Sequence, residues 1–133
     1  MRSTSTSQAG SRAQEQLWRS VLAGFGVSLV TTFVLSAIGG VVMTLATLNA
    51  ATVETAVPII GYLSAGMGGL YVGRRTGESG GRNGLLVGLA YLGLVLAVSA
   101  AVIREPISLA VLGTKGASII VVSAVGGIIG VNI

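Results

Sequence analysis

The carboxylate side chains of this 133-residue sequence are few and stand far apart, which limits the chemistry that they can perform. They are Glu15, Glu54, Glu78 and Glu105. The sequence has no His, no Cys and no Asp, so Ser-His-Asp and Cys-His nucleophiles, zinc sites with His or Cys ligands, and disulfides are excluded. We therefore predict no catalytic residues, no cofactor-binding residues and no metal site, and we expect that the protein is not an enzyme.

Charge is scarce throughout the chain. Charged residues make up 9% of the sequence and hydrophobic residues 52%, and the mean hydropathy is +0.88. A soluble domain has about 25% charged residues, so this composition indicates a membrane protein. The bases are Arg2, Arg12, Arg19, Arg74, Arg75, Arg82, Arg104 and Lys115.

Long uncharged segments separate these charges, and each is long enough to cross a membrane or nearly so. A spanning helix needs about 20 mostly apolar residues, and the strict alternation of a membrane β-strand is absent. We predict an all-α protein, an integral membrane four-helix bundle. The predicted spans are 21–48, 57–73, 84–103 and 110–132.

Two prolines set limits to these spans. Pro58 is expected near the start of the second span, where a missing backbone N–H is tolerated, and Pro106 ends the third span. Residues 107–113 have two interpretations, as a segment at the membrane interface or as the first turns of the fourth helix. We favour the interface, because residues 114–116 resemble a helix start. If these residues are instead the first turns of the fourth helix, the side chain of Lys115 would extend so that its ammonium group reaches the interface.

The distribution of bases predicts the orientation of the four spans. Residues 1–16 are polar and lack apolar periodicity, so we expect a disordered cytoplasmic tail, followed by a four-helix transmembrane domain over residues 17–133. Four spans place both termini on one side of the membrane. That side would hold six of the eight bases, and only Arg104 and Lys115 would lie opposite. The positive-inside rule then predicts that both termini are cytoplasmic.

Glycine is unusually frequent, with 21 residues, and much of it recurs at four-residue steps. Such a row lies oblique to a helix axis and permits a neighbouring backbone to come close, as in a glycine zipper. We predict Gly-mediated close helix packing, in which the second and third spans meet through their small faces, that is, the helix faces that carry glycine and other small residues. The predicted helix-packing residues are Gly61, Ala65, Gly69, Gly73, Gly77, Gly84, Gly88, Gly126 and Gly130.

The glycine rows have three interpretations. We favour packing within one compact monomer, and the alternatives are a face for a second copy and a glycine-lined conduit.

The loop at 74–83 also has two interpretations: Arg74, Arg75 and Arg82 contact lipid headgroups, or they only set the topology. Hydroxyl groups within the spans are expected to bond to the carbonyl group four residues earlier.

Three glycine-rich segments carry a family resemblance. They are GMGGLYVGRR at 66–75, GGRNGLLVGLAY at 80–91 and GGIIGVN at 126–132. Over residues 17–133 the sequence resembles a family of small four-span bacterial membrane proteins of unknown function, best known from spore-forming Gram-positive bacteria. The resemblance implies a bacterial cytoplasmic membrane and four helices, and it brings no catalytic residues.

Two hypotheses for the function follow. The first is a non-enzymatic integral membrane protein that acts as a packing, assembly or interaction module. Its partners would be the lipid bilayer and either a second copy or a larger membrane protein, and not nucleic acid, because the bases are few and explained by topology. The second is a subunit of a small channel or transporter. Proton-coupled transport needs a carboxylate within the membrane, whereas every Glu is expected in a tail or a loop.

Overall fold

The computed structural model describes residues 3–47, 49–102 and 108–133, and these residues form four α-helices. Each helix contains a segment that is long and apolar enough to cross a membrane. The prediction of an all-helical chain with four such helices is confirmed. The helices are α1 Ser3–Leu45, α2 Ala50–Thr76, α3 Gly80–Val102 and α4 Leu109–Asn132.

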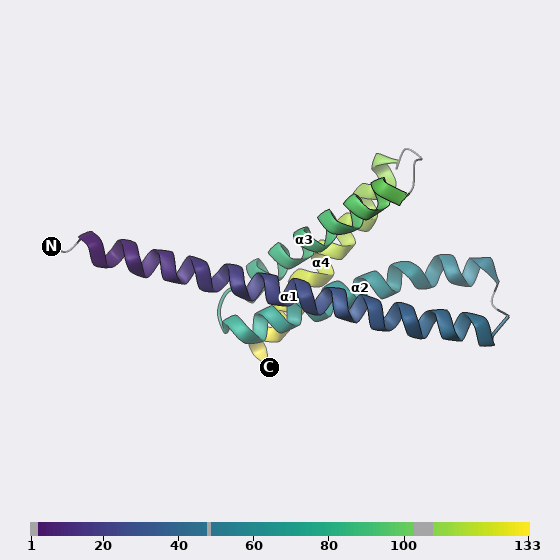
Figure 1. Cartoon of the computed structure of the whole chain (residues 1–133), viewed down its shortest axis with the longest axis horizontal. Coiled ribbons are helices and arrows are strands. Elements are labelled where there is room, and N and C mark those ends of the chain that lie inside the picture. Colours follow the sequence, from purple (N-terminus) through teal and green to yellow (C-terminus); the bar gives the residue numbers. More distant parts are fainter. Residues whose placement is uncertain (1–2, 48, 103–107) are drawn as a thin grey trace.

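The helices form two antiparallel pairs that cross and then diverge like the arms of a V (Figure 1). α1 runs beside α2, and α3 runs beside α4. The first arm is formed by the C-terminal part of α1 and the N-terminal part of α2, and the second arm by the C-terminal part of α3 and the N-terminal part of α4. The α2–α3 turn and the C-terminus lie away from the tips of the arms, and the N-terminal part of α1 projects beyond them (Figure 1). The most extensive packing joins α2 to α4.

α1 begins much earlier than the sequence pattern indicated. Residues 1–16 were expected to form a disordered tail, whereas the helix starts at Ser3 and continues without interruption to Leu45. Residues 8–17 include Ala, Gln, Arg, Glu and Leu, which are good helix formers. They extend a helix that the apolar segment has already nucleated, so no second nucleation is needed.

α2 also starts earlier than expected, and this changes the position of its proline. The helix begins at Ala50 instead of near residue 57, so Pro58 lies in its interior. Proline has no backbone N–H, and the carbonyl group of Glu54 therefore receives no hydrogen bond from position 58. At its other end α2 stops at Gly77, which has φ 64° and donates its N–H to Gly73 O at 3.1 Å. That left-handed conformation favours glycine.

α4 begins at Leu109, and its first residues settle part of the question left open over residues 107–113. Ser108 is the N-cap, and its Oγ accepts a hydrogen bond from the N–H of Val111 at 3.3 Å. Residues 109–113 are therefore the first turns of α4 and not an interface segment preceding it; residue 107 lies outside the described residues. The cap at Ser108 fixes this start, which agrees within one residue with the predicted span 110–132.

The buried apolar core is small and lies where the helices cross. It consists of two clusters, one shared by α1, α2 and α3 and the other by α2, α3 and α4. Large apolar side chains on the arms are exposed, for example Phe33 at 78% and Leu45 at 84%. Exposed apolar surface on this scale is typical of helices whose surroundings are lipid. The buried apolar residues are Val21, Ala65, Val72, Val87, Tyr91 and Ile119.

Candidate functional site

Glycine is concentrated in a region that we call the glycine crossing, formed by residues 65–73 of α2, 80–88 of α3 and 123–130 of α4. Here the helix backbones come so close that many glycines have no space for a side chain. The buried glycines of the crossing are Gly68, Gly69, Gly73, Gly80, Gly84, Gly88, Gly126, Gly127 and Gly130.

The contact between α2 and α4 is the closest part of the crossing. A Cβ atom at Gly69 would overlap the carbonyl oxygen of Ser123, and one at Gly73 would overlap the carbonyl oxygen of Gly127. Ala65, the small residue one step earlier in the row, is fully buried. Backbone atoms cannot move aside as a flexible side chain can, so these positions exclude any larger residue unless the helices separate.

The glycines at the end of α4 meet α2 in the same way. A Cβ atom at Gly126 would overlap the carbonyl oxygen of Gly66, and one at Gly130 would overlap that of Leu70. Each helix therefore presents a small face to the other, which is the arrangement that four-residue spacing permits.

The small faces of α2 and α3 were expected to face each other, but in the structure both face α4. A Cβ atom at Gly84 would overlap the carbonyl oxygen of Ser123, and one at Gly88 would lie 3.0 Å from Ser123 Cβ and 3.1 Å from Ile120 Cα. α4 provides small residues to both neighbours. It can therefore lie against α2 and α3 together, which the order of helices along the chain did not reveal.

The ends of the predicted row in α2 do not take part in this packing. A Cβ atom at Gly61 would lie 3.9 Å from the hydroxyl group of Tyr91, which is an ordinary contact distance. Gly77 is exposed, and a Cβ atom there would meet nothing within 4 Å. Gly77 ends α2 through its positive φ and does not pack against another helix.

The sequence analysis missed the role of α1 in the crossing. A Cβ atom at Gly24 would lie 2.9 Å from the carbonyl oxygen of Gly68, and one at Gly68 would lie 2.7 Å from that of Gly24. Ser28 beside them is fully buried. Gly24 and Ser28 are four residues apart, and that spacing is the signal that could have identified them.

Polar side chains at the crossing bond mostly to backbone carbonyl groups. Ser28 Oγ donates to Gly24 O at 3.2 Å, as expected of a hydroxyl group four residues further along a helix. Ser123 differs, because its Oγ donates across the crossing from α4 to Gly84 O at 2.7 Å. In the α2–α3 turn, buried Asn83 donates to Thr76 Oγ1 at 3.2 Å, and its own Oδ1 has no hydrogen-bond partner within the described ranges.

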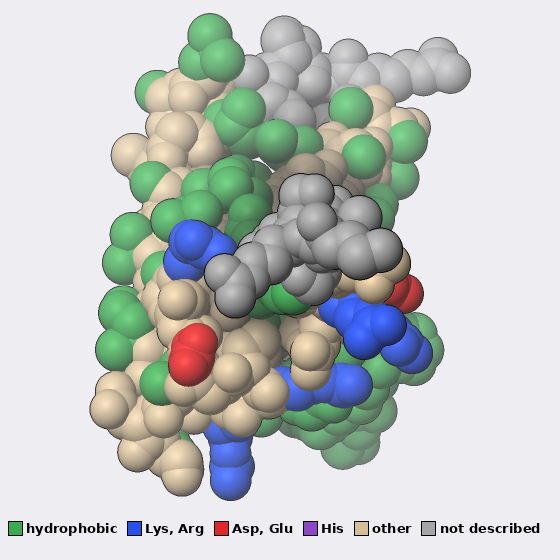
Figure 2. Space-filling model, turned by 90° about the vertical axis from the view of Figure 1, so that its left-hand side faces the viewer, with side chains coloured by type: hydrophobic (Ala, Val, Ile, Leu, Met, Phe, Trp, Pro, Cys, Tyr) green, Lys and Arg blue, Asp and Glu red, His purple; other side chains and the backbone are tan. Residues whose placement is uncertain are grey.

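Basic side chains gather at the end of the molecule that carries the α2–α3 turn (Figure 2). Two adjoining hollows of about 430 and 310 Å³ lie there, and Arg75 lines both of them. Of the predicted headgroup residues, Arg82 lines the second hollow, whereas Arg74 is exposed and lines neither. The other arginines of the hollows are Arg12 and Arg19 on α1. Arg12 and Arg19 of α1 thus form one basic surface with Arg75 and Arg82, which follow at least 56 positions later in the sequence.

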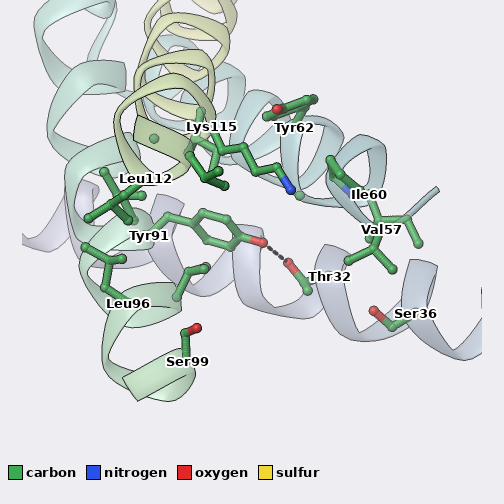
Figure 3. A pocket seen from close by; sticks show the side chains of 17 residues that line it. Thr32, Ser36, Val57, Ile60, Tyr62, Tyr91, Leu96, Ser99, Leu112 and Lys115 are labelled. Atoms are coloured by element: carbon green, nitrogen blue, oxygen red, sulfur yellow. Dashed lines mark hydrogen bonds between the residues drawn. The ribbon is translucent and has the colours of Figure 1, made fainter. Parts of the chain in front are cut away.

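A separate cleft of about 510 Å³ opens between the two arms (Figure 3). Its wall is mainly apolar. The principal apolar residues are Val57, Ile60, Leu92, Val95, Leu96 and Ile119. Its polar side chains are Thr32, Ser36, Tyr62, Tyr91, Ser99 and Lys115. Toward the crossing the cleft is bounded by a hydrogen bond of 3.0 Å between the hydroxyl groups of Thr32 and Tyr91.

Lys115 is the charged residue among the described residues that line this cleft. It lies six residues after Leu109, or about 9 Å along α4 at 1.5 Å per residue. Its side chain extends across the cleft toward α2, near Tyr62 and Ile60 (Figure 3). Lys115 was expected at the membrane interface, in a segment that resembles a helix start. The structure instead places it two turns inside a helix of membrane-spanning length, because the cap at Ser108 starts the helix before that segment.

Four helices of this length and hydropathy indicate the class of multi-pass membrane proteins. The chain belongs to the family described as "Protein of unknown function (DUF3792)", whose model matches residues 17–130. The matched residues are nearly the whole of the segment 17–133 over which the resemblance was noted from the sequence. No curated protein and no solved structure shows significant similarity to the chain.

Proposed function

We propose that this protein is a non-enzymatic interaction module of the bacterial cytoplasmic membrane, with both termini in the cytoplasm. The sequence supports a non-enzymatic role, because it has no His, Cys or Asp and its four Glu residues are isolated. The basic surface at the α2–α3 turn supports the orientation, since bases are enriched on the cytoplasmic side. On that surface Arg74, Arg75 and Arg82 would contact anionic headgroups, at about 1 kcal/mol for each base.

In this proposal the glycine crossing is a Gly-mediated packing core that holds the arms in a fixed relation. The observation that supports it is the direct opposition of glycine and backbone carbonyl groups between α2 and α4. In lipid, apolar side chains gain little by moving from lipid to protein, so close backbone contact becomes a main source of attraction between helices. The row from Gly69 to Gly73 is covered by α4 and is therefore not a surface for a second copy.

The surface proposed for association is instead the uncovered face of α1. Ser36, Gly40 and Thr44 recur at four-residue steps on the first arm, and all three are exposed. A Cβ atom at Gly40 would meet nothing within 4 Å. Large apolar side chains flank this row, including Val41 at 57% exposed. A second copy or a larger membrane protein would pack its own helix along this face, using the spacing that the crossing uses within the chain.

The experiment that tests the association compares two glycine substitutions in native membranes. Gly40→Leu would block the proposed face, whereas Gly93→Leu on α3 is a matched control, because a Cβ atom at Gly93 also meets open space. We expect Gly40→Leu to lower crosslinking to a second copy or a co-purifying protein at least fivefold, and Gly93→Leu to leave it unchanged. Equal crosslinking in both variants would contradict this use of α1.

A channel or transporter subunit remains a second candidate, and the cleft between the arms is the observation that favours it. The cleft carries Lys115 and several hydroxyl groups, and it is bounded by the Thr32–Tyr91 hydrogen bond. Transport would require the Thr32–Tyr91 hydrogen bond to break, so that the cleft opens toward the crossing. Flux of ions and small solutes through reconstituted vesicles tests the candidate, and absence of flux from wild-type protein and from Tyr91→Phe would count against it.

A further inference from the structure

The cleft between the arms places one cation in an apolar environment, and neither the sequence analysis nor the family description gives it a role. Lys115 lies inside a helix of membrane-spanning length, about 9 Å from its start. A charged side chain at such a depth is unfavourable unless it finds a partner or reaches the interface. No carboxylate is among the described residues that line the cleft. The site therefore favours an anion.

The apolar wall defines the rest of the ligand. Val57 of α2 and Leu92 and Val95 of α3 line the cleft from the two arms, and Val57 and Val95 are also exposed at the surface of the molecule. An aqueous anion would gain nothing from this wall, whereas an acyl chain would remain in contact with apolar groups along its length. The combination of one cation and a long apolar wall fits an anionic amphiphile that enters sideways from the membrane.

The size of the cleft fits a single lipid chain. Ligand sites for small molecules have volumes of about 300–1,000 Å³, and the cleft of about 510 Å³ lies within this range. The cleft therefore has the volume for one acyl chain.

We propose that the cleft binds one anionic membrane phospholipid. The ammonium group of Lys115 donates hydrogen bonds to the lipid phosphate, which is a common role for a lysine point charge. One acyl chain lies along the apolar wall between the arms, with its inner limit at the Thr32–Tyr91 hydrogen bond. This site is on the opposite side of the crossing from the arginines of the basic surface. It shares Ser36 with the face of α1 proposed for association, but the lipid contacts proposed here are made by Lys115 and the apolar wall.

The absence of native cysteine allows a direct test with a single probe in the cleft. Ser99 lines the cleft and its replacement by Cys changes little volume, so Ser99→Cys carries an environment-sensitive fluorophore at the site. Ala97→Cys on the same helix is the matched control, because Ala97 is exposed and does not line the cleft. Both labelled proteins are placed in phosphatidylcholine vesicles that contain brominated-chain phosphatidylglycerol or brominated-chain phosphatidylcholine as the quencher.

We expect the Ser99→Cys label to be quenched by brominated phosphatidylglycerol with about fivefold higher apparent affinity than by brominated phosphatidylcholine. The label at Ala97→Cys should show no such preference. Adding Lys115→Gln should remove the preference, and Lys115→Arg should retain it because the charge remains. Arg75→Gln changes the basic surface only and should also retain it.

Several results would overturn the proposal. Equal quenching by the two lipids at the Ser99→Cys label would show that the cleft does not select an anion. A preference that survives Lys115→Gln but disappears in Arg75→Gln would place the selectivity at the basic surface. Quenching by neither lipid, restored on dilution of the protein in lipid, would show that a second copy fills the cleft. Helicity measured by circular dichroism identifies a variant that fails to fold, and crosslinking through α1 remains a separate readout for the proposed function.

Discussion

Gly61 and Gly69 lie two turns apart on α2 and belong to the same predicted row, yet they have opposite environments. At Gly69 a Cβ atom would overlap the carbonyl oxygen of Ser123 on α4, whereas at Gly61 it would lie 3.9 Å from the nearest atom of Tyr91. The first residue belongs to the glycine crossing and the second lines the open cleft. A single sequence pattern therefore extends through a region of closest packing and a region of separation.

Helix geometry explains the difference. Four residues turn a helix by about 400°, so a row of this spacing drifts by about 40° at each step. Two straight helices that cross at an angle are close only near one point along such a row. Toward the arms the helices diverge, and glycine is no longer needed for close approach. There the space between the arms becomes the cleft.

The largest expected effect comes from adding a methyl group at the crossing. Gly69→Ala places its Cβ against the backbone of Ser123, which can yield only if α4 moves away from α2. Overpacking of this kind lowers the free energy of unfolding by about 1–3 kcal/mol, although alanine has the better helix propensity. The unfolding free energy in detergent or bicelles measures this loss.

Gly61→Ala is the matched control for that substitution. It adds the same methyl group to the same helix, but at an ordinary contact distance of 3.9 Å from the hydroxyl group of Tyr91. We expect a change in unfolding free energy between zero and about 1 kcal/mol in the stabilising direction, because alanine favours the helix. Equal destabilisation by both substitutions would mean that the crossing and the cleft do not differ in packing.

A smaller effect is expected from the hydrogen bond that spans the crossing. Ser123→Ala removes the donor to Gly84 O, for which the structure gives 2.7 Å. Interhelical hydrogen bonds of membrane proteins contribute about 0.6 kcal/mol on average, so a loss of that size is expected in the same measurement. Ser118→Ala is the control on the same helix, because Ser118 Oγ donates to Thr114 O within α4. A loss for Ser118→Ala as large as that for Ser123→Ala would show that the cross-helix bond has no special role.

Much of the fold could be predicted from the sequence, because it follows from local properties. The uncharged segments identify the four helices, and the hydroxyl bonds within α1, such as Thr31 to Val27 O at 2.8 Å, follow from spacing alone. The helix starts could not be predicted as well. Residues 50–56 extend α2 before Pro58 and beyond its predicted span, which hydropathy did not reveal, whereas α4 begins within one residue of its predicted span.

The candidate sites were less accessible to sequence reasoning, because they depend on how helix pairs meet. The row in α2 was visible, but the sequence did not show that α4 would cover it or that Gly24 of α1 would join it. Lys115 was assigned to an interface by its flanking residues. Its position in a cleft depends on the divergence of two arms that are far apart in sequence, and no local pattern encodes that divergence.

An effect as small as that of Ser123→Ala is expected at the boundary between the two regions, where Tyr91 and Thr32 share a hydrogen bond of 3.0 Å. Thr32 Oγ1 also bonds to Ser28 O at 2.8 Å, so a single substitution removes more than one interaction. A double-mutant cycle with Tyr91→Phe and Thr32→Val isolates the shared bond, and we expect a coupling of about 0.6 kcal/mol in the unfolding free energy. Tyr62→Phe, which changes a tyrosine in the cleft wall, should show no coupling to Thr32→Val. A coupling of zero for Tyr91 would mean that this bond does not close the base of the cleft in a membrane, and that the cleft reaches further toward the crossing.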